Sequence, residues 1–339
     1  MMKTYKMMFL TLLMVSTLIT ISSYSWMSMW IGLEINLLSM VTLMNNDLLM
    51  NSPESMIKYY LIQAMSSSLV MMCIIVELMS SSFLINIMNE SKTMIMMNIG
   101  LLIKMGTAPF HFWLPEVVEG IEWFNCFLIL TWQKIAPMVM LMFNMEFNLF
   151  IMIIILTSLI LSSILSFNQK SMRKILAYSS INHMGWMLAS MFTNKTIWLI
   201  YLIVYFILMI NLTSMMNMYK IFYINQLNNL NMNMFVKSMI SMNFLSLAGI
   251  PPFIGFLPKW LIIQVLIENK MFMLSLIFTI VALIMIFVYI RISMNMFALE
   301  NQKTKWLMNT NKSKNLLLMT MNFTSMLSLS MVTLMFNMT

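Results

Sequence analysis

Long apolar runs follow one another along almost the whole of this 339-residue chain. Hydrophobic residues make up 61% of it, charged residues only 9%, and the mean hydropathy is +0.87. A helix that crosses a bilayer needs about 20 mostly apolar residues. The sequence therefore predicts an all-α, polytopic membrane protein. It excludes a soluble globular domain, in which roughly a quarter of the residues carry charge, and it gives no indication of nucleic-acid binding.

The apolar runs predict about 11 transmembrane helices. The first run follows Lys3 and Lys6 as a signal peptide would. It lacks a small-residue cleavage site, however, and Trp26 opens another apolar run at once, so we expect it to remain as a span. The predicted spans are 7–23, 26–44, 55–80, 92–118, 123–143, 147–167, 172–191, 196–219, 238–269, 272–297 and 316–337.

The basic residues predict the orientation of these spans. With the spans above, only Lys92, Lys195 and Lys270 lie in loops on one side. Thirteen of the 19 basic residues lie on the other side, which is the asymmetry of the positive-inside rule. We therefore expect the N-terminus on the matrix or cytoplasmic side. The thirteen are Lys3, Lys6, Lys58, Lys170, Arg173, Lys174, Lys220, Lys237, Arg291, Lys303, Lys305, Lys312 and Lys314.

Two further features of composition bear on the cellular compartment and on metal binding. The 49 methionines are spread over the whole length rather than gathered in a stripe. This distribution is typical of an AT-rich gene in which AUA is read as methionine, as in animal mitochondria. We favour this explanation over a functional role of the methionine side chains. Cys73 and Cys126 lie inside apolar runs and are too few for a disulfide or metal framework, so we expect no metal site.

Four charged residues lie well inside predicted spans, away from the span ends. Glu34 is central in the second span, and Lys104, Lys134 and Lys259 lie within the fourth, fifth and ninth. A charge at mid-bilayer costs about 2.5–3.5 kcal/mol even on lenient insertion scales, and such residues mark ion or proton paths. The alternative is an internal ion pair that fixes helix register, although a buried pair does not reliably stabilise a fold. That alternative leaves two lysines unexplained, and we favour a proton path.

Two stretches of the chain share one motif. Residues 106–115 read GTAPFHFWLP and residues 249–258 read GIPPFIGFLP, both fitting G-x-x-P-F-x-x-x-L-P. Proline removes a backbone donor, and unsatisfied backbone at membrane depth occurs only within protein or beside a wet cavity. The motif therefore predicts two broken helices, and kinks that serve packing alone are the alternative. Its Gly and Pro positions are Gly106, Pro109, Pro115, Gly249, Pro252 and Pro258.

The two motifs lie five predicted spans apart, so their helices cross the membrane in opposite directions. This is the inverted-repeat arrangement of transporters, whose sites lie at discontinuous helices near the midplane. We expect a single transmembrane domain, 1–339, with pseudo-repeats at roughly 7–143 and 147–297 and a C-terminal helix at 316–337. Lys104 precedes the first motif by two residues, and Lys259 directly follows the second.

These residues resemble the antiporter-like membrane subunits of mitochondrial respiratory complex I, the NADH dehydrogenase of the respiratory chain. The resemblance covers nearly the whole chain up to about residue 300, and the number of spans agrees with a shortened member of that family. It is carried by WIGLEINLLS at 30–39, LLIKMGTAPFHFWLPEVVEG at 101–120, LTWQKIAPM at 130–138, LAYSSINHMGWM at 176–187 and GIPPFIGFLPKWLIIQ at 249–264.

The resemblance implies a role for each buried charge. Glu34 matches the carboxylate that modulates the first lysine, and Lys104 matches the lysine at the first broken helix. Lys134 matches the connecting lysine in the following span. Lys259 matches the lysine of the outlet half-channel at the second broken helix. No residue is implied to take part in covalent catalysis.

The resemblance also implies the setting. It places the chain in the mitochondrial inner membrane, N-terminus on the matrix side, beside other membrane-arm subunits, antiporter-like neighbours and lipids. Proton translocation is driven by NADH oxidation and ubiquinone reduction, with NADH, FMN, Fe–S clusters and ubiquinone held by other subunits and no cofactor in this chain. The sequence has no Rossmann glycine signature and no CxxC.

Three further polar residues are secondary candidates for the proton path. His183 lies mid-span, with Ser179 four residues earlier on the same helical face. The pair either extends a hydrated chain or makes an interhelical hydrogen bond. His111, inside the first motif, either relays protons or caps carbonyls freed by the break.

Two other functions stay open on the sequence alone. The chain could be a self-contained cation/proton antiporter, which would exchange ions without NADH. It could also be a structural subunit whose buried charges only hold helices together.

Overall fold

The computed structural model describes residues 4–45, 51–82, 87–144, 149–229 and 234–297. Within these ranges all regular structure is helical, apart from one isolated β-bridge between Ser171 and Tyr223. The predicted all-α fold is therefore confirmed for this part of the chain. The predicted span 316–337 and the basic residues from Lys303 to Lys314 lie outside the described residues.

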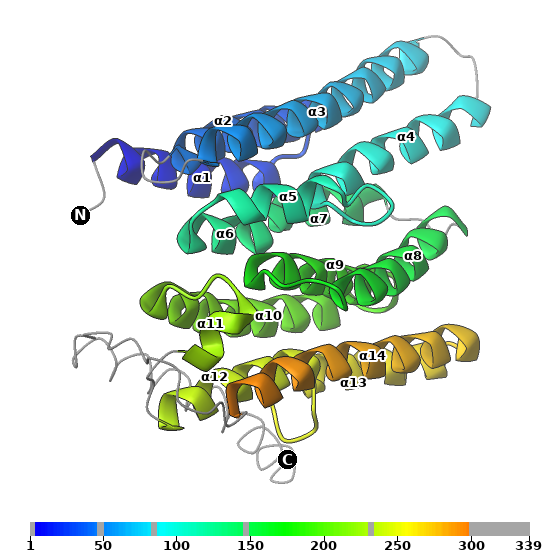
Figure 1. Ribbon diagram of the computed structural model, residues 1–339. Helices are drawn as coiled ribbons and strands as arrows, with labels where there is room; N and C mark the ends of the chain where they lie inside the picture. The colour runs from blue at the N-terminus through cyan, green and yellow to red at the C-terminus, as the bar shows by residue number, and fades with distance from the viewer. Residues whose placement is uncertain (1–3, 46–50, 83–86, 145–148, 230–233, 298–339) are drawn as a thin grey trace, which may run out of the picture. The chain divides into compact units, whose positions relative to one another are not determined.

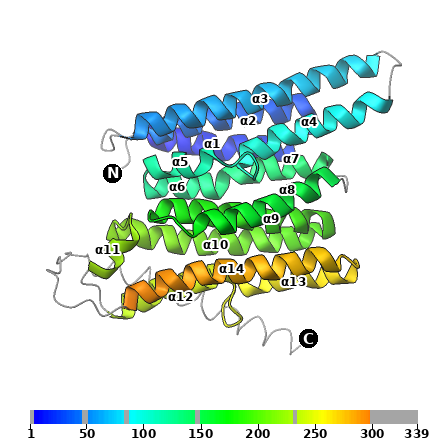
Figure 2. The same ribbon diagram turned by 45° about the vertical axis from the view of Figure 1, so that its right-hand side comes forward.

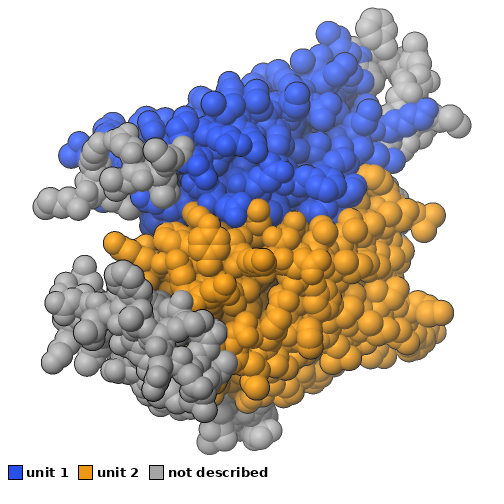
Figure 3. All heavy atoms as spheres, in the orientation of Figure 1, with its two compact units in different colours: residues 1–148 blue, residues 149–339 orange. Residues whose placement is uncertain are grey.

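The chain divides into two compact units, 1–148 and 149–339, coloured blue and orange in Figure 3. The helices of the first unit are labelled in Figure 1, and a short 3-10 helix, η1, lies between its last two α-helices. The elements are α1 (Thr4–Ser22), α2 (Trp26–Met44), α3 (Ser52–Ser82), α4 (Ile87–Met105), α5 (Trp113–Gly120), α6 (Trp123–Leu130), η1 (Trp132–Lys134) and α7 (Ile135–Asn144).

The described part of the second unit is also built from helices, of which α11 is the shortest (Figure 2). Its elements are α8 (Leu149–Ser166), α9 (Met172–Thr193), α10 (Lys195–Tyr219), α11 (Ile224–Asn229), α12 (Met234–Ala248), α13 (Phe256–Glu268) and α14 (Phe272–Phe297).

Seven segments of the described chain are helical, long and apolar enough to cross a membrane. Each coincides with a predicted span. A further predicted span, 172–191, is α9, a buried helix that carries several polar side chains. The predicted spans 92–118 and 238–269 are each divided into two helices, α4 with α5 and α12 with α13. The seven are Thr4–Ser22, Trp26–Met44, Ser52–Met79, Trp123–Asn144, Leu149–Ser166, Lys195–Tyr219 and Phe272–Phe297.

The helices pack in the same order within each unit. In the first unit, neighbours along the chain pack from α1 to α4, α3 also contacts α5, and α7 contacts α1 and α4. In the second unit, α8, α9 and α10 pack in succession, α10 contacts α12 and α13, and α14 contacts α8 and α12. In each unit the broken helix thus lies between one long helix and the last helix that the structure describes, α7 or α14.

Apolar side chains also lie on the outside of the helices. Leu18, Leu78 and Leu283 are each more than 60% exposed. Exposed large apolar side chains recur along most of the described helices, whereas large exposed apolar patches are rare on soluble monomers. A lipid bilayer covers such a surface, which agrees with the span assignment.

Candidate functional site

Three lysines within the predicted spans are buried. Lys104 and Lys259 are 6% exposed and Lys134 is 2% exposed. Glu34, on α2, is half-buried and close enough to Lys104 to interact electrostatically with its ammonium group. Glu34, Lys104 and Lys134 belong to the first unit and Lys259 to the second.

The first helix break follows directly from the glycine of the motif. Gly106 has φ +69°, a conformation that glycine adopts without steric cost. Its N–H donates to the Ile103 carbonyl over 3.1 Å, and the Thr107 N–H donates to Leu102 over 3.3 Å. These two bonds form a Schellman motif, the common way of ending an α-helix at glycine. The motif ends α4 one residue after Lys104.

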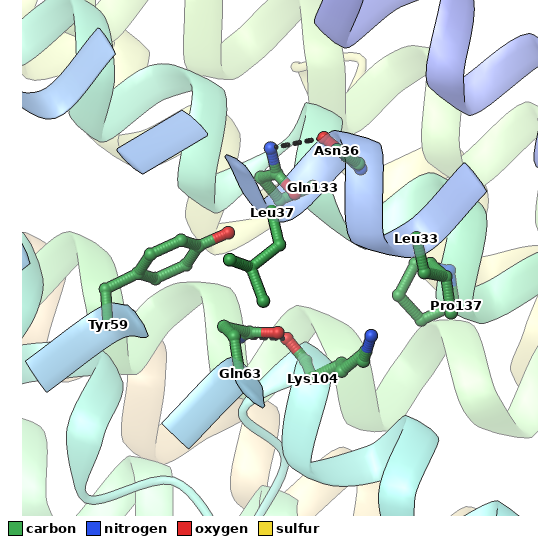
Figure 4. Close-up of a pocket in the computed structure, with 8 residues that line it drawn as sticks. All are labelled: Leu33, Asn36, Leu37, Tyr59, Gln63, Lys104, Gln133 and Pro137. Carbon is green, nitrogen blue, oxygen red and sulfur yellow. Dashed lines mark hydrogen bonds between the residues drawn. The ribbon is translucent and has the colours of Figure 1, made fainter. Parts of the chain in front are cut away.

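Side chains provide the remaining donors at the first break. Gln63, on α3, donates from Nε2 to the Lys104 carbonyl over 3.2 Å. Trp113 donates from Nε1 to the Ile103 carbonyl over 3.1 Å, and the Thr107 hydroxyl reaches Leu102 over 3.3 Å. Neutral donors therefore satisfy the end of α4. The ammonium of Lys104 extends instead into a cavity bounded by Pro137 (Figure 4).

The second break uses the same backbone conformation and a different donor. Gly249 has φ +81°, and the N–H groups of Gly249 and Ile250 donate to Ser246 and Leu245. Lys259 then donates from Nζ to the Leu247 carbonyl over 3.2 Å and to the Ala248 carbonyl over 2.7 Å. A lysine ammonium has three donors, and two of them are used here.

An aromatic ring lies beside the same ammonium. The Trp186 ring centroid is 5.8 Å from Lys259 Nζ, within the range of a cation–π interaction. Trp186 is fully buried and packs edge-on against Phe278, with centroids 4.6 Å apart. Lys259 is thus held between the end of α12 and a fixed indole ring.

The prolines of the motifs lie where a helix tolerates them. Pro115 and Pro258 are each the third residue of the helix that follows the break. The first N–H groups of a helix have no intrahelical acceptor, so proline removes no helical hydrogen bond there. Pro109 and Pro252 lie within the breaks themselves. The prolines therefore allow a helix to begin again after each glycine.

A third irregular segment carries Lys134. The predicted span 123–143 is not one continuous α-helix, because η1 separates α6 from α7. Pro137 has no N–H to donate one turn back, which accounts for the tighter turn before it. Short 3-10 segments inside a helix often mark functional positions. The proline in LTWQKIAPM was the sequence signal for this feature.

The secondary candidates take part in local contacts. His183, on α9, shares a 2.7 Å hydrogen bond through Nδ1 with the Tyr201 hydroxyl on α10, which is the interhelical bond considered above. The Ser179 hydroxyl donates to the Leu176 carbonyl of its own helix over 2.8 Å. His111 is 1% exposed, stacks on Phe112 and lies beside the Pro109 carbonyl.

Several polar residues next to the lysines were not singled out from the sequence. Asn36, Tyr59, Gln63 and Gln133 line the cavity that holds Lys104, and Trp186 faces Lys259. Neutral amides and aromatic rings are common in this chain, so only the folded structure distinguishes these members. Among the described residues no three His, Cys, Asp or Glu side chains are grouped as metal ligands would be.

Comparisons with known proteins agree on one family. A family model described as "NADH:quinone oxidoreductase/Mrp antiporter, TM" matches residues 23–285. Two relatives named "NADH-ubiquinone oxidoreductase chain 2" are similar over 333 residues, with 97% of both chains covered: that of Anopheles gambiae at 42% identity and that of Aedes aegypti at 44%.

A solved structure supports the fold. A chain of "Respiratory complex I from Thermus thermophilus with bound Aureothin" is similar with a TM-score of 0.85 at 19% identity. The match covers 96% of the present chain and 78% of that one. At this identity the similarity concerns the fold.

Proposed function

This chain belongs to the NADH:quinone oxidoreductase/Mrp antiporter membrane family, and we propose that it is a proton-translocating membrane-arm subunit of NADH:ubiquinone oxidoreductase. Its relatives of nearly equal length are named as chain 2 of that enzyme. The chain thereby takes part in an enzyme without carrying a redox centre of its own. NADH, FMN, Fe–S clusters and ubiquinone bind in other subunits.

The observation that carries the proposal is the burial of Lys104, Lys134 and Lys259 beside irregular helix segments. Burying three lysines in a membrane protein is energetically costly, and charged residues kept at such positions typically mark an ion or proton path. Lys104 and Lys259 lie at breaks, where backbone carbonyls and polar side chains replace water around a charge. Each lysine can hold a proton, and none needs a covalent intermediate.

The proposed roles follow the order of the residues along the chain. Glu34 acts on the charge of Lys104, since the two groups interact electrostatically. Lys134 takes the connecting position on η1, and Lys259 releases the proton at the second break. A proton that arrives at one lysine raises the energy of a proton on its neighbour, and this electrostatic coupling moves protons onward.

The location and topology belong to the same proposal. The chain lies in the mitochondrial inner membrane beside antiporter-like subunits and lipids, with its N-terminus on the matrix side. The thirteen-to-three distribution of basic residues supports this orientation. The proposed inverted pseudo-repeats, roughly 7–143 and 147–297, each contain one G-x-x-P-F-x-x-x-L-P break.

Replacement of Lys104 by methionine tests the proposal. We expect the assembled complex to pump fewer protons per NADH oxidised in proteoliposomes. Lys195→Met is the matched control, because Lys195 is exposed at the start of α10 and its replacement removes the same charge. Full pumping by Lys104→Met would contradict the proposal.

Two further measurements separate the competing functions. A self-contained antiporter would exchange cations for protons when the purified chain alone is placed in liposomes without NADH. A structural subunit would keep full pumping after Glu34→Gln and Lys104→Met are combined. We expect no exchange in the first experiment and impaired pumping in the second.

A further inference from the structure

Two connections between helices meet at one end of the second unit. The Met172 N–H donates to the Phe222 carbonyl over 2.8 Å, and the Ile224 N–H donates to the Lys170 carbonyl over 3.1 Å. These bonds join the α8–α9 connection to the α10–α11 connection, and α11 packs against α14 at the same end (Figure 2). We call this junction the basic end, because it carries Lys170, Arg173, Lys174, Lys220 and Arg291.

Arg291, on α14, has hydrogen-bond donors to offer at the basic end. Its Nη1 donates to the Phe167 carbonyl at the end of α8. Its Nε and Nη2 make no hydrogen bond to any residue that the structure describes. A guanidinium has five N–H donors in a planar fork that matches the oxygens of a phosphate. Because Arg291 is only half-buried, part of this side chain can be reached from outside.

Acidic residues are almost absent from the second unit. Within residues 149–229 and 234–297, Glu268 is the only Asp or Glu. Glu268 precedes α14, and about 28 Å of helix separates the start of α14 from Arg291. A cation without a nearby carboxylate attracts anions strongly where the surrounding dielectric is low. The anion that complements the basic end therefore comes from outside this part of the chain.

Other cations lie close to Arg291 at the same end. Lys170 follows Phe167 by three residues, so their Cα atoms are at most about 11 Å apart. Lys170 is exposed, as is Lys220 after the end of α10. The guanidinium of Arg173 lies over the Phe222 ring, 4.8 Å from its centroid, which fixes that charge at the junction. The basic end therefore presents several cations to one anionic ligand.

An exposed apolar face leads to the basic end. On α14, Leu283, Phe287 and Ile290 are 66%, 56% and 40% exposed and follow the spacing of one helix face. On α8, which packs against α14, Ile164 is 55% exposed. The Phe167 and Phe287 rings, with centroids 5.8 Å apart, connect the two helices where Arg291 binds the Phe167 carbonyl. A ligand with an anionic head and apolar chains fits both surfaces, whereas a soluble anion or an acidic peptide uses only the cations.

We propose that the basic end binds the phosphate of an anionic phospholipid through Arg291 and Lys170, with the acyl chains of that lipid on the exposed face of α8 and α14. Basic pockets between membrane helices bind headgroups of this kind. A lipid with net negative charge suits the site better than a zwitterionic lipid, whose ammonium group would meet the lysines. The inference concerns a lipid contact, goes beyond the proposed proton path and holds whether or not the buried lysines carry protons.

Photoactivatable lipids test the site in the assembled complex, reconstituted into nanodiscs without NADH. One probe is phosphatidylglycerol with a diazirine in an acyl chain, and the other is phosphatidylcholine with the same chain. We expect the anionic probe to label peptides containing Ile164 and Phe287 about twentyfold more than the zwitterionic probe, because two cations contribute. The exposed face of α10, which includes Ile203 and Ile207, is the internal reference and should be labelled equally by both. Equal labelling at both faces would overturn the proposal.

Single substitutions assign the enrichment to the two cations. Lys170→Gln and Arg291→Gln should each lower the ratio of anionic to zwitterionic labelling about fivefold, as expected for one cation near a membrane surface. Lys195→Gln is the matched control, because Lys195 is exposed at the opposite end of α10 from Lys220, and it should leave the ratio unchanged. Lys170 is exposed, so Lys170→Gln keeps the test decisive if Arg291→Gln fails to assemble.

Two outcomes would contradict the assignment. An unchanged ratio in both Lys170→Gln and Arg291→Gln would show that the basic end is not the headgroup site. Addition of inorganic phosphate, compared with chloride at equal ionic strength, separates the two sources of a phosphate group. We expect no effect, and loss of the enrichment in inorganic phosphate would show that the site takes free phosphate instead of a lipid. Proton pumping is not part of the readout, so the result is independent of the Lys104→Met experiment.

Discussion

In both broken helices the backbone ends one helix and begins the next with the same pattern of glycine and proline. At each break a glycine with positive φ ends the helix in a Schellman motif, and a proline lies in the first turn of the next helix. The residues in between are mostly different, since GTAPFHFWLP and GIPPFIGFLP share only five positions. The backbone path therefore depends on glycine and proline positions and tolerates different side chains.

The breaks differ in the groups that satisfy the freed carbonyls. At the first break, the carbonyl of the residue two before the glycine accepts from Gln63, a neutral amide on another helix. At the second break, the equivalent carbonyl, that of Leu247, accepts from the Lys259 ammonium. The first lysine thus projects into a cavity, whereas the second is bound to the backbone of its own break.

This difference separates two roles that a buried lysine can have. Lys104 can change its proton occupancy while Gln63 and Trp113 continue to hold the end of α4. When Lys259 loses its proton, its two remaining N–H donors can still reach the Leu247 and Ala248 carbonyls, but both hydrogen bonds lose the assistance of the positive charge and weaken. We therefore expect charge and local structure to be coupled at the second break and largely independent at the first.

The largest expected effect is at Gly255, between the second glycine and α13. A Cβ there would overlap the Ser246 carbonyl oxygen, which belongs to the backbone and cannot move aside cheaply. We expect Gly255→Ala to destabilise the chain by about 4 kcal/mol or more and to abolish assembly. The motif position that matches Gly255 is Phe112 at the first break, and Phe112 is 71% exposed.

Phe112→Ala is the matched control for Gly255→Ala. It should leave the amount of assembled complex, measured on native gels, unchanged. Normal assembly of Gly255→Ala would mean that the second break has as much space for a side chain at this motif position as the first break has.

The next effect distinguishes the two lysines by stability. Lys259→Met leaves the Leu247 and Ala248 carbonyls without their ammonium donor, and an unsatisfied buried acceptor costs about 1–3 kcal/mol. We expect a loss of about 3 kcal/mol in addition to the loss of pumping. Lys104→Met should impair pumping with a stability change below about 1 kcal/mol, because Gln63 and Trp113 still cap α4.

Thermal shift of the assembled complex measures this contrast, and proton pumping is recorded on the same preparations. An equal thermal shift for both lysine variants would show that the Lys259 ammonium stabilises the second break no more than the Lys104 ammonium stabilises the first.

The sequence predicted the breaks because glycine and proline act through the backbone, which a linear motif displays directly. It also predicted which lysines are buried, since charge inside an apolar run is conspicuous. It did not predict η1, because Pro137 acts one turn before its own position and the run 123–143 is apolar enough, despite Lys134, to be taken as one helix. The donors at the breaks were also missed, because Gln63 reaches Lys104 from 41 residues away and an amide in a span carries no signal of its partner.

A moderate effect on stability is expected at Trp113, whose indole N–H donates a hydrogen bond to the Ile103 carbonyl. The matching residue in the second motif is Phe256, which has no N–H to offer. Trp113→Phe therefore makes the first break more like the second without supplying its lysine. Because the Gly106 N–H still donates to the Ile103 carbonyl, we expect a loss of about 1 kcal/mol, as for one of two hydrogen bonds to a shared acceptor.

The measurement is again thermal shift of the complex, with Phe124→Leu, a change at a 37% exposed aromatic residue of the same unit, as the control. Because Gly106 also donates to Ile103, a shift near zero would mean that the backbone bond alone satisfies that carbonyl.

The smallest effect is expected at Thr107, the residue after the first glycine, which matches Ile250 in the second motif. Its backbone N–H and its hydroxyl both reach the Leu102 carbonyl over 3.3 Å, whereas Ile250 has only the backbone bond to Leu245. Thr107→Val keeps the shape and the backbone bond, so we expect a loss of only about 0.5 kcal/mol and unchanged proton pumping. If pumping instead fell as far as in Lys104→Met, the hydroxyl would belong to the proton path, and the first break, like the second, would combine capping with proton transfer.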